Sequence, residues 1–216
     1  MAVPLYVFLG FLEAGKTSFI QETLEDPDFN TGEKTLLVLC EDGETEYVPE
    51  KFAGGNVAVL PVEGQQALTR ELFEEYTKKH RVDRVLVEYN GMWPVQALYD
   101  ALPKGWEIFQ MMTVADSSTF PAYLANMRQL AVEKVQEPDV VIFNRVTDAT
   151  DKATLHRAVR MVNRLSLIHI SAFDAARHYE PRRAGPFQPD ACLHPSGGRR
   201  VLPVSYTHLD VYKRQA

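Results

Sequence analysis

The sequence predicts an α/β fold, in which a mainly parallel β-sheet carries helices on both faces. Short apolar runs, which are typical of buried strands, alternate along the chain with segments whose apolar residues recur at helical spacing. Most of these runs are followed by polar or acidic residues, as expected where parallel strands end at one edge of a sheet. A chain of 216 residues is long enough for one such domain and a short appendage. We expect the domain to cover residues 1–164 and an irregular tail to cover residues 165–216.

The individual elements follow from these patterns in chain order. The predicted strands cover residues 4–9, 34–40, 56–62, 84–88, 109–115 and 139–143. The predicted helices cover residues 18–24, 65–80, 95–102, 117–136 and 151–165. Asp116 is expected to cap the fourth helix, in which Pro121 is tolerated only near the first turn, and Thr150 or Asp151 is expected to cap the fifth. Because crossovers between parallel strands are right-handed, the loops that follow the strands should converge at one edge.

Residues 10–17 read Gly-Phe-Leu-Glu-Ala-Gly-Lys-Thr and match the phosphate-binding pattern GxxxxGK[ST] without a substitution. They lie between a predicted strand and a predicted helix, which indicates the P-loop NTPase fold and places backbone N–H groups around a polyphosphate. Lys16 is expected to reach the outer phosphates, and the Thr17 hydroxyl is expected to bind Mg²⁺. The residues predicted to bind nucleotide in this loop are Gly10, Glu13, Ala14, Gly15, Lys16, Thr17 and Ser18. The alternative is a glycine turn before an ordinary amphipathic helix.

Three residues that follow other strands are candidates for the same site. Glu88 ends an apolar strand, where a carboxylate can hold Mg²⁺ or orient the attacking water, so Lys16 and Glu88 are the predicted catalytic residues. Gly91 is expected to bring its N–H close to the terminal phosphate. Glu41 lies in an acidic loop that can sense this phosphate through the metal, so the predicted metal ligands are Thr17, Glu88 and Glu41. Solvated carboxylates at Glu88 and Glu41, and an ordinary turn at Gly91, are the alternatives.

The loop after the last predicted strand bears on the choice of base. A carboxylate can accept hydrogen bonds from the N1 and exocyclic amino groups of guanine, an edge that adenine does not offer. The usual guanine-reading motif is Asn-Lys-x-Asp, whereas this chain has Asn144 followed by Arg145, and its acid, Asp148, comes one position late. We expect Asn144 and Asp148 to bind GTP, and binding of ATP stays open.

Composition restricts the partners of the chain. There are 23 Lys and Arg against 29 Asp and Glu, and a net charge of -6 argues against a general nucleic-acid or anionic-membrane surface. No apolar run is long enough to span a bilayer. Two cysteines, Cys40 and Cys192, cannot build a disulfide framework. We therefore expect a cytoplasmic protein that binds nucleotide, but neither nucleic acid nor membrane.

Taken together, these segments resemble the nucleotide-binding domain of the CobW/HypB/UreG family of P-loop GTPases over residues 4–164. Residues 10–17 differ from the family's GFLGAGKT only at Glu13. Three further segments resemble family motifs, namely residues 40–43 (Asn-Glu-Phe-Gly), 88–94 (Glu-Thr-Thr-Gly-x-x-Pro) and 114–116 (Val-Val-Asp). The resemblance implies GTP and Mg²⁺ as cofactors, a role in metal insertion or cofactor assembly, and a client metalloprotein or a second copy of the chain as partner.

Two departures limit what the resemblance implies. The family's metallochaperones carry Cys-x-Cys-Cys before the strand that ends in Glu88, whereas residues 59–64 here read Val-Leu-Pro-Val-Glu-Gly. Cys40 alone cannot build a tetrahedral site for a soft metal. From Leu165 the helical periodicity fails, and residues 165–171 and 204–215 resemble translated sequencing-adapter read-through. We expect a non-native or disordered tail, although residues 165–170 can still pair as a strand; a basic tail that binds an anionic partner is the alternative.

The sequence therefore predicts a Mg²⁺-dependent P-loop nucleotidase, a GTPase with slow turnover that acts as a switch in metal or cofactor handling. A nucleotide-binding interaction module without turnover is the first alternative. A small-molecule kinase that uses the same phosphate loop is the second.

Overall fold

The computed structural model describes residues 3–170, which form a seven-stranded sheet with six α-helices and two short 3₁₀ turns. The strands are β1 (Pro4–Leu9), β2 (Thr35–Leu39), β3 (Val57–Pro61), β4 (Arg84–Glu88), β5 (Glu107–Asp116), β6 (Val140–Asn144) and β7 (Leu167–Ile170). The helices are α1 (Lys16–Glu25), α2 (Arg70–His80), α3 (Val95–Ala101), α4 (Phe120–Asn126), α5 (Arg128–Gln136) and α6 (Lys152–Val162). The 3₁₀ turns are η1 (Pro49–Lys51) and η2 (Gln65–Ala67).

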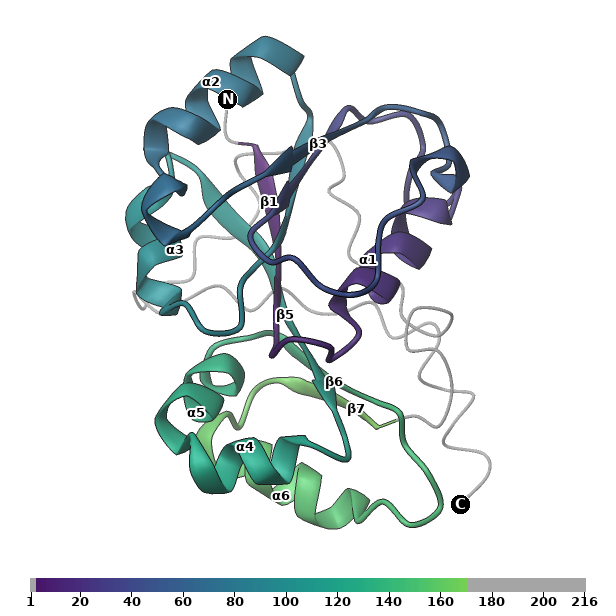
Figure 1. Cartoon of the computed structure of the whole chain (residues 1–216), viewed down its shortest axis with the longest axis vertical. Helices are drawn as coiled ribbons and strands as arrows, with labels where there is room; N and C mark the ends of the chain where they lie inside the picture. Colours follow the sequence, from purple (N-terminus) through teal and green to yellow (C-terminus); the bar gives the residue numbers. More distant parts are fainter. Residues whose placement is uncertain (1–2, 171–216) are drawn as a thin grey trace, which may run out of the picture. The chain divides into compact units, whose positions relative to one another are not determined.

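All seven strands pair in parallel, in the order β3-β2-β4-β1-β5-β6-β7. The predicted α/β fold with a mainly parallel sheet is therefore confirmed. Strand β1 lies at the centre, where Val7 is in register with Val87 of β4 and with Met111 of β5. Since every strand runs in the same direction, the loops that follow β1, β2, β4, β5 and β6 begin at one edge of the sheet (Figure 1).

Alternating side chains of β1 build a core on each face of the sheet. Val7 packs in a cluster with Phe73 of α2 and Leu98 of α3 on one face. Phe8 packs with Ile20 of α1 on the other, so α1 lies across the sheet from α2 and α3 (Figure 1). A third cluster around Phe143 of β6 includes residues of α4, α5 and α6. The first two clusters fix β1 and α1, and with them the loop that joins the two elements.

The helix expected over residues 65–80 is shorter than predicted, because two local features interrupt it. Residues 65–67 form the turn η2, and Leu68 is extended. The helix α2 then starts after Thr69, whose hydroxyl accepts a hydrogen bond from the Leu72 N–H at 3.3 Å. A threonine in this role ends the preceding segment and caps the following one.

The helix expected over residues 117–136 is divided into α4 and α5 at Met127. The Asn126 side chain donates to the Ala122 carbonyl at 2.9 Å, and this local bond competes with the helical ladder. Pro121 lies in the first turn of α4, as predicted. Asp116 does not cap that helix, since α4 begins four residues later and its cap position, Thr119, makes no side-chain capping bond.

The sheet has one strand more than the six predicted above, and this strand follows β6 in the chain. Residues 167–170 form β7, which pairs with β6 so that His169 is in register with Ile142. A parallel edge position accepts such a short apolar segment. The remainder of the expected tail, residues 171–216, lies outside the described residues, and the domain boundary near residue 164 stays a prediction. Within residues 3–170, no helix has the length and hydropathy needed to cross a bilayer.

Candidate functional site

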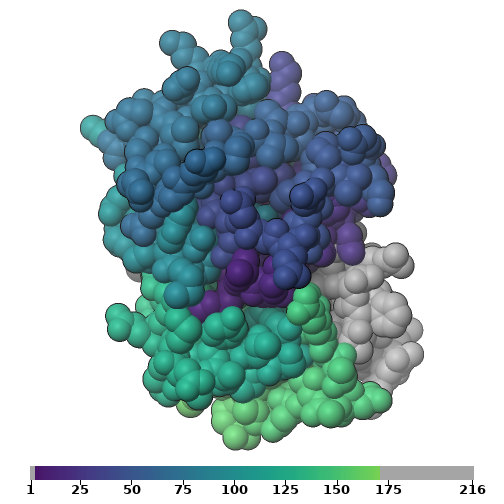
Figure 2. All heavy atoms as spheres, viewed as in Figure 1, coloured from purple at the N-terminus to yellow at the C-terminus, as the bar shows by residue number. Residues whose placement is uncertain are grey.

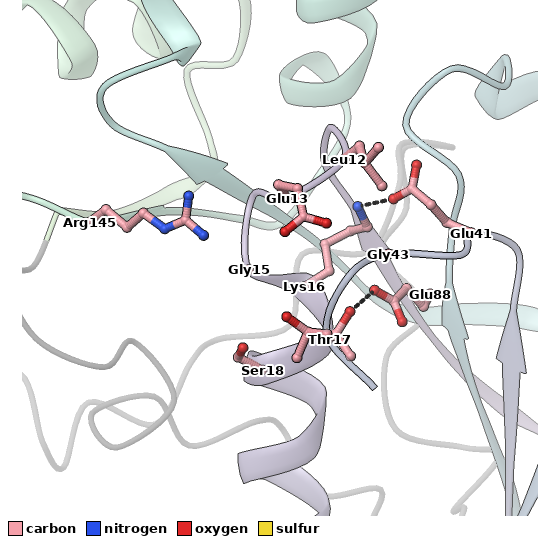
Figure 3. A pocket seen from close by; sticks show the side chains of 11 residues that line it. Leu12, Glu13, Gly15, Lys16, Thr17, Ser18, Glu41, Gly43, Glu88 and Arg145 are labelled. Carbon is pink, nitrogen blue, oxygen red and sulfur yellow. Dashed lines mark hydrogen bonds and ion pairs between the residues drawn. The ribbon is translucent and has the colours of Figure 1, made fainter. Parts of the chain in front are cut away.

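The loop of residues 10–17 joins the central strand β1 to α1 at the edge where the strands end (Figure 3). Gly15 precedes α1 in the left-handed conformation, with φ 95°. A Cβ at this position would lie 2.2 Å from Nδ2 of Asn144, so a side chain would displace that amide. The same Nδ2 donates to the Ala14 carbonyl at 3.1 Å. Asn144 therefore ties the loop after β6 to the phosphate-binding loop.

Lys16 is the first residue of α1, and its side chain is buried beneath the loop. Its Nζ donates to the Gly10 carbonyl at 3.1 Å and to the Phe11 carbonyl at 2.9 Å. It also forms an ion pair with a carboxylate oxygen of Glu41, from the loop after β2. The anion that pairs with the lysine in this structure is therefore the carboxylate of Glu41.

The Glu41 carboxylate is bound through both of its oxygens. Its second carboxylate oxygen accepts a hydrogen bond from the Gly91 N–H at 3.1 Å. Gly91 lies very close to the phosphate-binding loop, since a Cβ there would be 2.7 Å from the Gly10 oxygen. The carboxylate therefore lies between Lys16 and Gly91, the two groups that the sequence predicts to contact the terminal phosphate.

The space that remains in this pocket is small. Side chains and loops from β1, β2, β4 and β6 enclose a cavity of about 30 Å³, room for one or two water molecules. Pockets that hold ligands measure several hundred Å³. The Glu41 carboxylate fills the space between the Lys16 ammonium group and the Gly91 N–H. Figure 2 shows the amino-terminal part of the chain, in purple, reaching the surface between the blue and green parts.

Thr17 and Glu88 meet beside this pocket (Figure 3). The Thr17 hydroxyl donates to one carboxylate oxygen of Glu88 at 2.8 Å, and the Tyr47 hydroxyl donates to the other at 2.6 Å. Burial raises the pKa of Glu88, although the hydrogen bonds from Tyr47 and Thr17 oppose this effect. A hydroxyl and a buried carboxylate are the hard oxygen donors that Mg²⁺ prefers, so these residues fit the ion.

Tyr47 is a site residue that the sequence did not indicate. It follows the acidic loop and belongs to no recognisable motif. Burial and the neighbouring Glu88 carboxylate raise its pKa, so the hydroxyl stays protonated and serves as a donor.

Glu13 links the phosphate-binding loop to the acidic loop. It adopts a left-handed conformation, with φ 59°, which is uncommon for a residue with a side chain. Its carboxylate accepts a hydrogen bond from the Glu44 N–H at 3.1 Å. Glu41 and Glu44 therefore attach the acidic loop to the phosphate-binding loop at two points.

The base-reading candidates are only partly brought together. Arg145 lines the pocket, and its guanidinium donates to Asp116 at 2.9 Å. Asp116 also accepts from the Ser118 N–H and hydroxyl at 2.8 and 2.6 Å, and this local turn explains why it does not cap α4. Burial opposes the change, but Ser118 and Arg145 lower the pKa of Asp116. Asp148 is exposed in the loop after β6 and is not among the residues that line the pocket.

The described residues offer no cluster for a soft metal. Across residues 3–170, no three His, Cys, Asp or Glu side chains lie close enough together to hold a metal ion. Cys40 is buried next to Glu88 and Glu41, and burial together with these charges raises the pKa of its thiol to about 12. A thiol that stays protonated is a poor ligand, because metals bind the thiolate.

Comparison with known proteins identifies the family. Residues 4–169 match the model of the CobW/HypB/UreG nucleotide-binding domain. The chain belongs to the CobW/HypB/UreG family. This confirms the resemblance drawn from residues 10–17 and from the motifs after the later strands, and it relates the chain to metallochaperone GTPases. No curated protein sequence matches the chain significantly.

Solved structures share the fold at low sequence identity. Zn(II)-bound YjiA GTPase from E. coli is 19% identical with a TM-score of 0.55, and the match covers 79% of this chain and 57% of that one. Hydrogenase maturation factor HypB from Archaeoglobus fulgidus is 15% identical with a TM-score of 0.55, over 77% of this chain and 79% of that one. FlhF complexed with GMPPNP and Mg²⁺ is 13% identical with a TM-score of 0.53, over 77% and 65%. The chain thus spans little more than half of YjiA.

Proposed function

We propose that this chain is a Mg²⁺-dependent nucleotide switch that binds GTP, hydrolyses it slowly and acts in metal or cofactor handling. The observation that carries the proposal is that Lys16 and Thr17 line one pocket together with Glu88, which ends β4. Both residues belong to the loop whose sequence matches the phosphate-binding pattern.

Each of these groups has a defined task. Lys16 would exchange its ion pair with Glu41 for the outer phosphates and stabilise the charge that develops on the transferred phosphoryl group. Thr17 and Glu88 would hold Mg²⁺, which when bound neutralises phosphate oxygens. Glu88 would also orient the attacking water, and the Gly91 N–H would bind the terminal phosphate in place of Glu41.

Slow turnover is consistent with the side chains present. Among the described residues that line the pocket there is no histidine, and the carboxylates are engaged with hydroxyl, N–H or ammonium donors. Such a site lacks a strong general base. A client protein or a second copy of the chain would then supply the groups that accelerate hydrolysis.

The proposed preference for GTP rests on the family and on Asn144 and Asp148. The proposed biological role rests on the family. Asn144 already connects the base-reading loop to Ala14, and Asp148 lies three positions after Arg145 on that loop. Among the proteins of similar fold, YjiA is a GTPase and HypB is a hydrogenase maturation factor. The FlhF structure contains GMPPNP and Mg²⁺. These relatives favour GTP as the nucleotide and metal or cofactor assembly as the process.

The test is calorimetric titration of GTP and ATP, each with Mg²⁺, into the full chain and two variants. We expect GTP to bind more tightly than ATP, Lys16→Ala to abolish binding of both, and Asp148→Asn to reduce the preference for GTP. A cooperative melting transition of each variant controls for folding. If neither nucleotide binds to the folded wild-type chain, the proposed function is wrong.

A further inference from the structure

Helix α5 presents two adjacent charged residues to the loop that follows β4. Lys134 is only 1% exposed, and its Nζ donates to the Trp93 carbonyl at 2.5 Å. The same ammonium group lies 5.5 Å from the centre of the Tyr89 ring. The neighbouring Glu133 accepts a hydrogen bond from the Val95 N–H. Glu133 and Lys134, which we call the α5 clamp, thus hold both sides of the turn at residues 93–95.

A lysine at this depth is costly, and the cost indicates a specific role. Burial lowers the pKa of Lys134 to about 8, with Glu133 and Glu41 opposing the shift and Lys16 adding to it. An apolar side chain would fill the same place without desolvating a charge. The Lys134 carbonyl is itself fixed by the Thr113 hydroxyl of β5, so α5 offers the ammonium group from a rigid position.

The clamped turn is continuous with Gly91. The Trp93 N–H donates to the Asn90 carbonyl at 3.3 Å, and the Met92 N–H donates to the Asn90 side chain at 2.8 Å. The Tyr89 hydroxyl closes the other side by donating to the Pro94 carbonyl at 2.6 Å. Gly91 thus lies inside a turn whose two ends, Asn90 and Trp93, are joined by a hydrogen bond.

We propose that Lys134 is a positioning residue, which holds the turn at Trp93 so that the Gly91 N–H points into the anion site beside Lys16. The inference rests on the proposed function, because the anion there is the terminal phosphate of a nucleoside triphosphate. Lys134 touches neither nucleotide nor metal in this scheme, and it acts only through the loop. A nucleoside diphosphate, which lacks the terminal phosphate, does not depend on the clamp.

The experiment measures the exposure of Trp93 and the affinity for nucleotide separately. The chain has two tryptophans, so Trp106→Phe leaves Trp93 as the sole tryptophan, whose fluorescence reports on the turn. In this background we compare Lys134→Met with Lys78→Met, a matched change at an exposed lysine of α2. Acrylamide quenching of Trp93 is measured without nucleotide. Calorimetry with Mg²⁺ then gives the affinities for GMPPNP and for GDP.

We expect Lys134→Met to increase the quenching of Trp93 about twofold and to weaken GMPPNP binding about tenfold, with GDP binding unchanged, since one hydrogen bond to a charged group is lost. Lys78→Met should change none of these quantities. Unchanged quenching and an unchanged ratio of the two affinities in a cooperatively folded Lys134→Met would overturn the inference.

Three further outcomes each have a defined consequence. If the parent chain binds neither nucleotide, the proposed function fails, and the quenching of Trp93 alone decides whether Lys134 positions the turn. If Lys134→Met does not fold, Glu133→Ala loosens the clamp from its other side and is judged by the same two measurements. Equal losses of GMPPNP and GDP affinity would show a general defect of the site and would also count against the proposal.

Discussion

Gly91→Ala is the most direct test of how the site reads a terminal phosphate. The added Cβ would lie 2.7 Å from the Gly10 oxygen and 2.8 Å from the Phe11 Cα, both backbone atoms of the phosphate-binding loop. Ordinary contact needs about 3.4 Å, so one loop must retreat by about 0.7 Å. Gly10 directly follows the central strand β1, so we expect the loop of Gly91 to move.

This retreat would break the hydrogen bond that the Gly91 N–H donates. The bond to Glu41 is 3.1 Å long, and a lengthening of this size takes a bond beyond the useful range. A hydrogen bond to a charged acceptor contributes roughly 1.5–3 kcal/mol, so affinity for GMPPNP should fall roughly ten- to a hundredfold. GDP affinity should stay within about twofold, because no terminal phosphate is lost. Calorimetry with Mg²⁺ measures both, and equal losses for the two nucleotides in a variant that melts normally would refute the reasoning.

Three more outcomes are expected. Glu88→Gln keeps one oxygen for the Thr17 hydroxyl but loses the second acceptor, which Tyr47 uses, and the negative charge, so Mg²⁺ should no longer strengthen GMPPNP binding. The folded-state pKa of Lys134 is about 8 against 10.5 for an exposed lysine, so the unfolded chain binds more protons between these pH values. The free energy of unfolding should therefore rise by about 3 kcal/mol across that window, and urea titrations of Lys134→Met should lack this rise. Phe73 is fully buried against Trp106, and Phe73→Ala should cost about 3–5 kcal/mol in the same titrations, a result that a loss below about 1 kcal/mol would contradict.

The sequence was sufficient for the architecture because the determining signals are local. Residues 4–9 and 84–88 are apolar runs with clear ends, and the structure gives both strands these bounds. The break of the helix near Asn126 and the start of α2 at Thr69 depend on single side-chain hydrogen bonds that compete with helix formation. The spacing of apolar residues along the chain carries no information about such competition.

The candidate site was predictable only in part, for a similar reason. The motif and the ends of the strands indicated Lys16 and Glu88, which the fold brings to one edge. Tyr47 contacts Glu88 from a loop, and Lys134 of α5 contacts the turn at Trp93, and both contacts depend on packing. Neither belongs to a motif, so only the three-dimensional arrangement connects them to the site.

The ion pair between Glu41 and Lys16 also bears on how the chain folds. Burying a lysine charge costs several kcal/mol, a large share of the stability of an ordinary domain, unless nearby groups offset this cost. Here the counter-charge comes from the chain itself, since the carboxylate lies only 25 residues further along the sequence. The domain can therefore complete its central strand and the start of α1 before it meets any ligand. The chain should therefore show a cooperative melting transition in the absence of nucleotide.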